Sequence, residues 1–353
     1  MSSMAVSVMP AADTLARTLL AARGAEWGDW SVEALQETAG RLGWETRRDE
    51  DGRLVIETGI PGLLCRGDPG EHAEGAPCVR LTAPLPVRVD PPPPTPGLHG
   101  PVVPGQYAYG GGGIGAWGTV PYVRDRGREL DAAHTRLGAA LTATLGPAPW
   151  RGGPAAWLRW RSRRITLRLS RDDANEALVM ELFPTRAGEA FERRGFESAQ
   201  SLAALPYIWC VSRPDMSLAE LFLPFGPDPR DWADFRDALP RVLTSLVVDM
   251  PLVGWVEPVL LVLGDVAEPA HTAEIRVGQD RLELGNMPGN GRQVWLRPGA
   301  EHAVAAAESI LEAFAHWDID GVRRLRTRAW TSGGYVDLPG IGVRPEGTHP
   351  DDA

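Results

Sequence analysis

Two groups of residues in this chain have types and spacings that could do chemistry, and the first is a run of glycines. Residues 110–122 read GGGGIGAWGTVPY, in which Gly113, Gly115 and Gly118 have the G-x-G-x-x-G spacing that lets a backbone wrap a dinucleotide pyrophosphate. Such a fingerprint follows a strand and opens a helix, so that the helix N-terminus meets the phosphates. Here a proline-rich stretch precedes the glycines, and Pro121 falls where the helix interior should be. We therefore interpret the run as a loop and predict no cofactor.

Aromatic residues lie in and beside this glycine run. They are Tyr107, Tyr109, Trp117 and Tyr122. Simple linkers rarely carry so many aromatic side chains, and aromatic residues anchor protein interfaces at a low entropic cost. We predict that these residues bind a protein partner. The alternative is that they pack the loop back onto its own sheet.

Arginines form the second group, and they crowd residues 151–171 and again residues 323–328. The fork-shaped guanidinium group suits phosphate and carboxylate ligands. From the first cluster we predict an anion-binding set. Its members are Arg159, Arg161, Arg163 and Arg168. Two alternatives are an ordinary solvent-facing side of a strand and a surface that binds an acidic partner.

The chain contains no lysine, so all 36 of its Lys and Arg residues are arginine. A GC-rich genome explains this bias, because lysine codons are rich in A whereas the codons for Ala, Gly, Pro and Arg are rich in G and C. The other explanation is avoidance of lysine-directed modification or ligation, which needs a free amine. In either case arginine has to occupy the exposed positions that lysine and arginine share in other proteins.

Other residues that commonly do chemistry lack the neighbours they would need. His134 lies on the apolar stripe of a predicted helix, which indicates a core histidine. Cys210 sits among apolar residues, and its nearest basic neighbour in sequence is Arg213. The chain has no G-x-S-x-G or H-E-x-x-H motif, and its three cysteines fit no metal or redox spacing. We therefore predict no catalytic residue and no metal site.

Composition and charge exclude several classes of protein. The 353 residues are 43% hydrophobic and 23% charged, which is typical of a folded globular chain. The net charge of −10 argues against nucleic acid as a partner, because nucleic-acid-binding proteins present basic surfaces. No apolar run reaches the roughly 20 residues of a membrane-spanning helix, and no basic residue precedes the first apolar positions as in a secretory signal. We expect a cytoplasmic protein.

The elements that must position these residues recur in one order. A helix followed by antiparallel strands is predicted three times, starting near residues 31, 129 and 229. This order indicates an α+β fold in which helices pack on one face of antiparallel sheets. The length favours two domains. We place them at residues 1–190, with a proline- and glycine-rich loop at 84–128, and at residues 191–353.

Local signals predict several of the element ends. Ser31 is expected to cap the helix that follows it, and Asp51-Gly52 to form the turn of a hairpin over residues 44–58. Asp228-Pro229 is expected to open a later helix, with Asp231 in the place of the capping-box acid. Pro240 is expected to kink or restart that helix, because proline lacks the backbone N–H that the helix interior needs.

Two stretches carry a resemblance to a bacterial family. They are SVEALQETAGRLGWETRRDEDGRLVIETG, from residue 31, and LGAALTATLGPAPWRGGPAAWLRWRSRRITLRLS, from residue 137. Over residues 25–183 the chain resembles an uncharacterised family from high-GC bacteria, whose members have a helix ending in L-G-W and a later W-L-R-W-R strand. Such small α+β proteins look like immunity proteins encoded beside secreted toxins. The resemblance implies a protein partner and supplies no site residues.

The sequence therefore leads to two functional expectations. The first is a cytoplasmic, non-catalytic protein of the immunity or scaffold type, which engages a protein partner through sheet faces and the loop at 105–122. The second is an enzyme or small-ligand binder that uses arginines to hold an anionic ligand between the two domains.

Overall fold

The computed structural model describes residues 12–60, 64–73, 76–86, 124–172, 177–212, 227–332 and 334–343. The glycine run and the predicted partner-binding residues Tyr107, Tyr109, Trp117 and Tyr122 lie outside these ranges. The chain divides into two compact units, one of Met1–Ala148 with Leu158–Glu189 and one of Pro149–Trp157 with Ala190–Ala353. The sequence-based division at residue 190 differs from this one in placing Pro149–Trp157 with the N-terminal domain.

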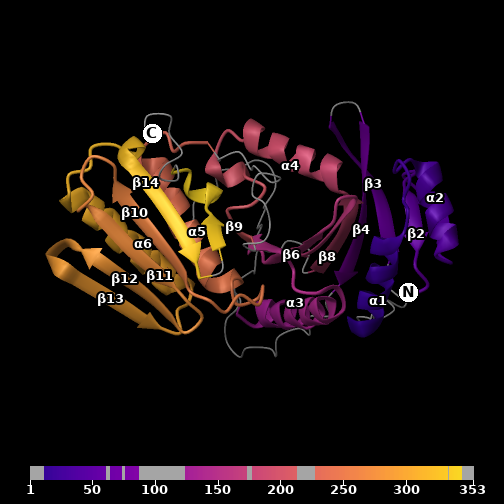
Figure 1. Ribbon diagram of the computed structural model, residues 1–353, viewed down its shortest axis with the longest axis horizontal. Coiled ribbons are helices and arrows are strands. Elements are labelled where there is room, and N and C mark those ends of the chain that lie inside the picture. The colour runs from indigo at the N-terminus through magenta and orange to yellow at the C-terminus, as the bar shows by residue number, and fades with distance from the viewer. Residues whose placement is uncertain are drawn as a thin grey trace, which may run out of the picture. The chain divides into compact units, whose positions relative to one another are not determined.

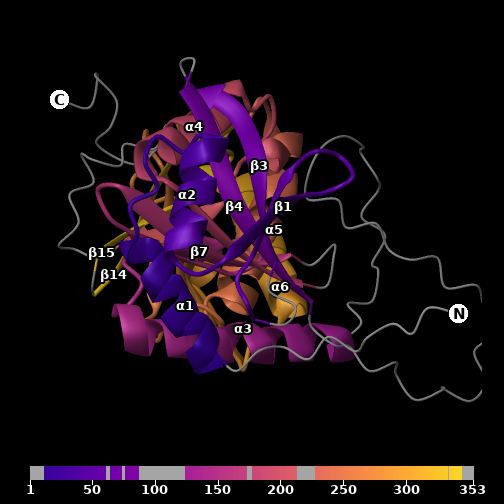
Figure 2. The same ribbon diagram turned by 90° about the vertical axis from the view of Figure 1, so that its right-hand side faces the viewer.

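Helices and antiparallel strands build both units, which confirms the predicted α+β class (Figure 1). The elements up to the end of the first unit are α1 (Ala12–Gly24), α2 (Val32–Arg41), β1 (Glu45–Arg48), β2 (Leu54–Glu57), β3 (Leu64–Ala73), β4 (Ala76–Pro86), α3 (Arg124–Leu145), β6 (Trp157–Arg161), β7 (Ile165–Asp172), β8 (Ala177–Pro184) and α4 (Thr185–Ser198). Strands of this unit follow the order β1-β2-β3-β4-β8-β7-β6. Helices α1 and α3 lie side by side and contact β7 (Figure 2).

The predicted caps and turns of the first unit are present. The backbone N–H of Ala34 donates to Ser31 Oγ at 3.2 Å, so Ser31 caps α2. Gly52 has a φ of +77°, a left-handed conformation that favours glycine at the turn between β1 and β2. His134 is 0% exposed in α3, beside the buried apolar stripe of that helix. The sequence pattern thus placed this histidine in the core correctly.

Strand β3 and helix α4, whose residues up to Glu189 belong to the first unit, carry sequences that favour other structure. Strand β3 reads LCRGDPGEHA, in which proline and glycine are typical of loops rather than strands. Helix α4 contains Gly188, where a Cβ atom would overlap the ring of Phe183. Close packing of the helix on β8 therefore requires a residue that weakens helix propensity, and the local pattern misses the helix.

The second unit places its helices on one face of its sheet. Its elements are β5 (Trp150–Gly153), β9 (Trp209–Ser212), α5 (Trp232–Asp249), β10 (Val259–Asp265), β11 (Thr272–Val277), β12 (Arg281–Met287), β13 (Gly291–Leu296), α6 (Ala300–His316), β14 (Leu325–Thr331) and β15 (Gly334–Asp337). Strands follow the order β5-β9-β15-β14-β10-β11-β12-β13. Helices α5 and α6 lie side by side behind the strands in Figure 1, and Leu261, Ile275 and Leu284 are 0% exposed.

Helix α5 begins at Trp232 with Asp231 as its cap, so the predicted opening at Asp228-Pro229 lies too early, and the helix continues through Pro240. Asp231 Oδ1 accepts hydrogen bonds from the backbone N–H groups of Ala233, at 2.7 Å, and Asp234, at 3.1 Å. Pro240 lies inside one continuous helix, so of the two expectations the restart is wrong and the kink stays a prediction. Burial of Leu239 and Leu243, both 0% exposed, stabilises the helix on either side of the proline.

A buried chain of hydrogen bonds joins β9 to α5. The indole Nε1 of Trp209 donates to Ser245 Oγ at 2.7 Å, and Ser245 Oγ donates to Asp249 Oδ2 at 2.6 Å. All three residues are buried. Gly153 lies against this chain, because a Cβ atom there would overlap both Ser245 Oγ and Trp209 Nε1. The packing therefore requires glycine at this position.

Candidate functional site

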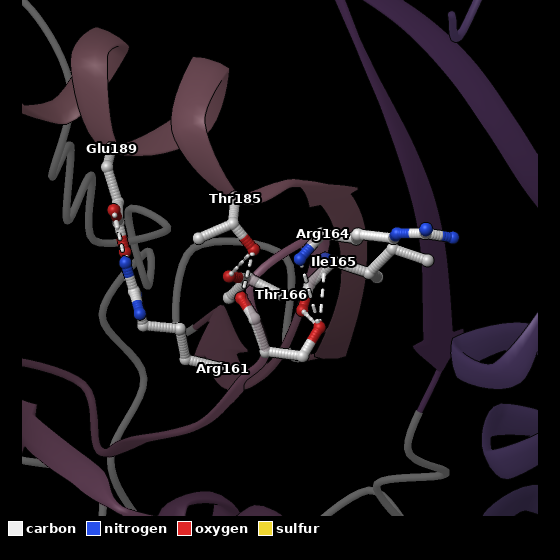
Figure 3. Close-up of polar contacts among 7 residues, drawn as sticks. Arg161, Arg164, Ile165, Thr166, Thr185 and Glu189 are labelled. Atoms are coloured by element: carbon white, nitrogen blue, oxygen red, sulfur yellow. Dashed lines mark hydrogen bonds and ion pairs between the residues drawn. The ribbon is translucent and has the colours of Figure 1, made fainter. Parts of the chain in front are cut away.

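The predicted anion-binding arginines lie on β6, β7 and the turn between them. Arg161, at the end of β6, forms a two-pronged ion pair with Glu189 of α4, with 3.1 Å between Arg161 Nη2 and Glu189 Oε2 (Figure 3). The two side chains are 14% and 15% exposed. This contact ties the β6–β7 hairpin to the first turns of α4, and it uses the fork of the guanidinium that an anionic ligand would need.

Hydroxyl groups join the same hairpin to the start of α4. Thr185 Oγ1 donates to the carbonyl oxygen of Ser162 at 2.8 Å and lies 3.0 Å from Thr166 Oγ1 (Figure 3). The backbone N–H of Thr185 donates to the carbonyl of Arg164 at 2.9 Å. These contacts position α4 relative to β6 and β7 within the first unit, which is a structural role.

Carboxylates also face the arginines of β7. Arg168 forms an ion pair with Glu181, its direct cross-strand neighbour on β8, and Arg171 forms one with Asp131 of α3. Arg159 is 1% exposed, whereas Arg163 is exposed in the turn. The fold thus brings Arg161 and Arg168 together with intramolecular carboxylates, and binding of an external anion by this set stays a prediction.

A different surface lies on the helix-free side of the second unit's sheet, and of its residues only Arg326 and Arg328 belong to an arginine cluster named from the sequence. On β10, β11 and β14, residues with buried side chains face α5 and α6, and the alternate residues point to the other side. Strand register then assigns the residues of β12 and β13 to one side or the other. We call this side the outer face. Its residues are Leu260, Val262, Gly264, Glu274, Arg276, Arg281, Glu283, Gly285, Arg292, Val294, Leu296, Arg326, Arg328 and Trp330.

Strand register sets which of these side chains are neighbours. Trp330 of β14 pairs with Leu260 of β10, which in turn pairs with Arg276 of β11. Arg276 pairs with Glu283 of β12, and Glu283 pairs with Val294 of β13. One row across five strands therefore carries an aromatic ring, two aliphatic side chains, an arginine and a glutamate. Arginine and aromatic residues are enriched at protein interfaces.

Glu283 lies at the centre of a basic group of residues. Arg292 Nη2 lies 2.9 Å from Glu283 Oε2, and Arg281 Nη1 lies 3.0 Å from Glu283 Oε1. Burial acts to raise the pKa of Glu283, but the hydrogen bond from Arg292 and the charges of Arg292, Arg281 and Arg276 outweigh it and hold that pKa below its usual value. Glu283 is therefore ionised at neutral pH, and it meets more positive charge than it can neutralise.

Exposed apolar side chains continue this surface onto β13. Val294 is 47% exposed and Leu296 is 74% exposed. Both belong to the same side of β13 as Arg292, because they alternate with Gln293, which accepts a hydrogen bond from Ser309 of α6. The alternation of arginine with apolar residues in LRTRAWT and RQVWL was the available sequence signal for this face.

Cys210 and Asp337 form a separate pair on β9 and β15. Cys210 is 1% exposed, as its apolar surroundings predicted, and its Sγ donates to Asp337 Oδ2 at 3.7 Å. Burial raises the pKa of Asp337, and the hydrogen bond from Cys210 offsets only part of that rise. The pair holds two adjacent strands together at Cys210↔Asp337.

Among the residues that the structure places, no group of three or more His, Cys, Asp or Glu side chains could hold a metal ion. No helix among the same residues is long and apolar enough to cross a membrane. Comparisons with protein-family models, curated proteins and solved structures find no match for this chain.

Proposed function

We propose that this chain is a cytoplasmic, non-catalytic protein that acts by binding another protein, as an immunity-type or scaffold protein does. The observation that carries this proposal is the outer face, where Trp330, Leu260 and Val294 lie among arginines on a sheet whose other side is covered by α5 and α6. A surface that combines an aromatic residue, aliphatic residues and arginine matches the composition of protein interfaces.

The arginines of the first unit give less support to the alternative function of holding a small anion. Arg161 and Arg168 have carboxylate partners inside the unit, which satisfy the charge that a free anion would otherwise meet. A ligand would have to displace Glu189 or Glu181. The displaced carboxylate would then stay partly buried without its arginine, which costs free energy. Arg276, Arg281 and Arg292 of the outer face instead share one carboxylate, Glu283.

Affinity capture of the tagged full chain, expressed in the organism that encodes it, tests this proposal. We expect a stoichiometric protein complex by size-exclusion chromatography with light scattering, and we expect Trp330→Ser to weaken it at least about tenfold, as for a buried interface anchor. Trp317→Ser is the matched control, because Trp317 stacks on His271 at 5.5 Å, away from the outer face. A co-purifying metabolite, or thermal stabilisation by phosphorylated small molecules without a protein partner, would overturn the proposal and favour the anion-binding alternative.

A further inference from the structure

Strand β13 ends the order of strands in the second unit's sheet. It pairs with β12 along one edge, from Arg281↔Leu296 to Met287↔Gly291, and among the described residues no strand pairs with its other edge. Proteins commonly protect such an edge with lysine, proline or inward-pointing charge. Here the edge strand has no lysine or proline, and exposed Val294 and Leu296 lie beside its single charged residue, Arg292. Its backbone is therefore available to an added strand.

The outer-face side chains beside this edge set the chemistry of an added strand. Arg292, Val294 and Leu296 alternate along β13, so a neighbouring strand would place one side chain opposite each of them. Arg292 is 65% exposed and shares Glu283 with Arg281, which is 57% exposed. A carboxylate opposite Arg292 would supply part of the negative charge that this group of arginines lacks.

Resting on the function proposed above, we infer that the free edge of β13 binds an extended acidic segment of the partner protein as an additional β-strand. Main-chain hydrogen bonds to β13 supply the pairing, as in other cases of strand addition. Specificity comes from a glutamate or aspartate opposite Arg292 and from apolar residues opposite Val294 and Leu296.

Two other occupants fit these residues less well. In a symmetric antiparallel pair of two β13 strands centred on Val294, Arg292 would face Leu296 of the second copy, which supplies no carboxylate. A nucleic acid would bring phosphates to Arg292 and Arg281, but it would also meet Glu283 and the exposed aliphatic side chains. The net charge of −10 on the whole chain adds long-range repulsion of a polyanion.

A fluorescein-labelled peptide of about eight residues, alternating threonine with glutamate and valine, is a direct probe, because its length matches that of a typical strand. We expect the full chain to bind it in a fluorescence-anisotropy titration, and Arg292→Glu to weaken binding about tenfold or more. Arg236→Glu is the matched control, because it makes the same change of charge at an exposed position on α5. Circular dichroism checks that both variants keep the fold.

Three companion probes separate the possible outcomes. The same peptide with N-methylated backbone groups should fail to bind, and a peptide with glutamine in place of glutamate should bind more weakly. Equal binding of either peptide overturns the inference, as does tighter binding of an oligothymidylate. A dimer of the chain that dissociates in the Leu296→Asp variant assigns the edge to a second copy and also overturns it. If a captured protein partner depends on Trp330 but not on Arg292, strand addition is wrong while the proposed function stands.

Discussion

Removal of the Ser245 hydroxyl should destabilise the second unit by far more than one surface hydrogen bond would. The hydroxyl accepts from Trp209 Nε1 at 2.7 Å and donates to Asp249 Oδ2 at 2.6 Å, and all three side chains are buried. Ser245→Ala leaves the indole N–H without this acceptor and takes a donor from a buried carboxylate. A buried group left without its partner costs about 1–3 kcal/mol, and more if charged. We therefore expect a loss of about 2–4 kcal/mol in the free energy of unfolding.

Thermal and urea unfolding, followed by tryptophan fluorescence and circular dichroism, measure this loss. For a unit of this size about 2–4 °C of Tm corresponds to 1 kcal/mol, so the melting transition should fall by roughly 5–15 °C. Ser309→Ala is the matched control, because Ser309 sits on α6 and bonds Gln293 at the surface at 3.2 Å. It should change the free energy of unfolding by less than about 0.5 kcal/mol.

A double-mutant cycle with Trp209→Phe then tests the cause. If the penalty comes from the unpaired indole, Ser245→Ala should cost less in the Trp209→Phe background than in the native chain, with a coupling of about 0.5–3 kcal/mol. The reasoning is refuted if the single variant melts like the control, or if the two substitutions add without coupling.

Three further predictions concern other contacts. Gly153→Ala should destabilise the second unit about as much as Ser245→Ala, because its Cβ atom would overlap the bond between Trp209 and Ser245; chemical denaturation checks this. Burial raises the pKa of Asp337 in the folded chain above its value in the unfolded chain. Ionisation of Asp337 therefore lowers the free energy of unfolding as the pH rises through the range between these two pKa values. Asp337→Asn should thus gain stability over the native chain at neutral pH, with a difference that shrinks on acidification, as a series of urea titrations against pH would report. Glu189→Ala should cost about 1–3 kcal/mol and speed hydrogen exchange at the start of α4, because it removes the partner of Arg161.

Local signals in the sequence were sufficient for much of the fold. Ser31 caps α2 because a side-chain oxygen next to a periodic apolar stretch can accept from the first free N–H groups, whatever the rest of the chain does. The turn at Gly52 likewise depends on a conformation that neighbouring residues impose. The start of α5 is less well predicted, because Asp231 caps it rather than the expected entry at Asp228-Pro229. Helix α4 and strand β3 form despite residues that disfavour them, because Gly188 of α4 packs on Phe183 of β8 and β3 pairs with β2 and β4, so their own composition is misleading.

The ion-pair partners of the arginines could not be predicted from sequence spacing alone, because they lie far away along the chain. Arg161 and Glu189 lie 28 residues apart, and Arg171 and Asp131 lie 40 apart. Only the fold brings these charges together, whereas sequence alternation identifies the side of a strand on which a residue lies. The outer face could not be found from the sequence for a similar reason, because only the register of five strands places Trp330 and Val294 in one row.

The lack of lysine has different consequences at different arginines. Arg161 uses two nitrogens on the two oxygens of Glu189, and Arg324 does the same with Asp265, whose side chain is 0% exposed. A lysine, which is a point charge, could not reproduce these forks. Arg281 and Arg292 each contact Glu283 through one nitrogen. Geometry therefore requires arginine at the buried pairs, while the lack of lysine on the outer face follows from codon bias or avoidance of lysine modification. The frequency of lysine in neighbouring genes decides between these two.

An acidic chain with a basic outer face has a defined electrostatic consequence for binding. At a distance, the net charge of −10 repels an acidic partner, and this repulsion is screened beyond a Debye length of about 8 Å at physiological salt. Within that distance Arg276, Arg281 and Arg292 dominate, because Glu283 neutralises only part of their charge. Attraction thus acts after encounter rather than during approach. Substitutions that change the charge of the outer face should accordingly alter the dissociation rate of an acidic partner more than its association rate. A surface that steers its ligand over long range would show the opposite order.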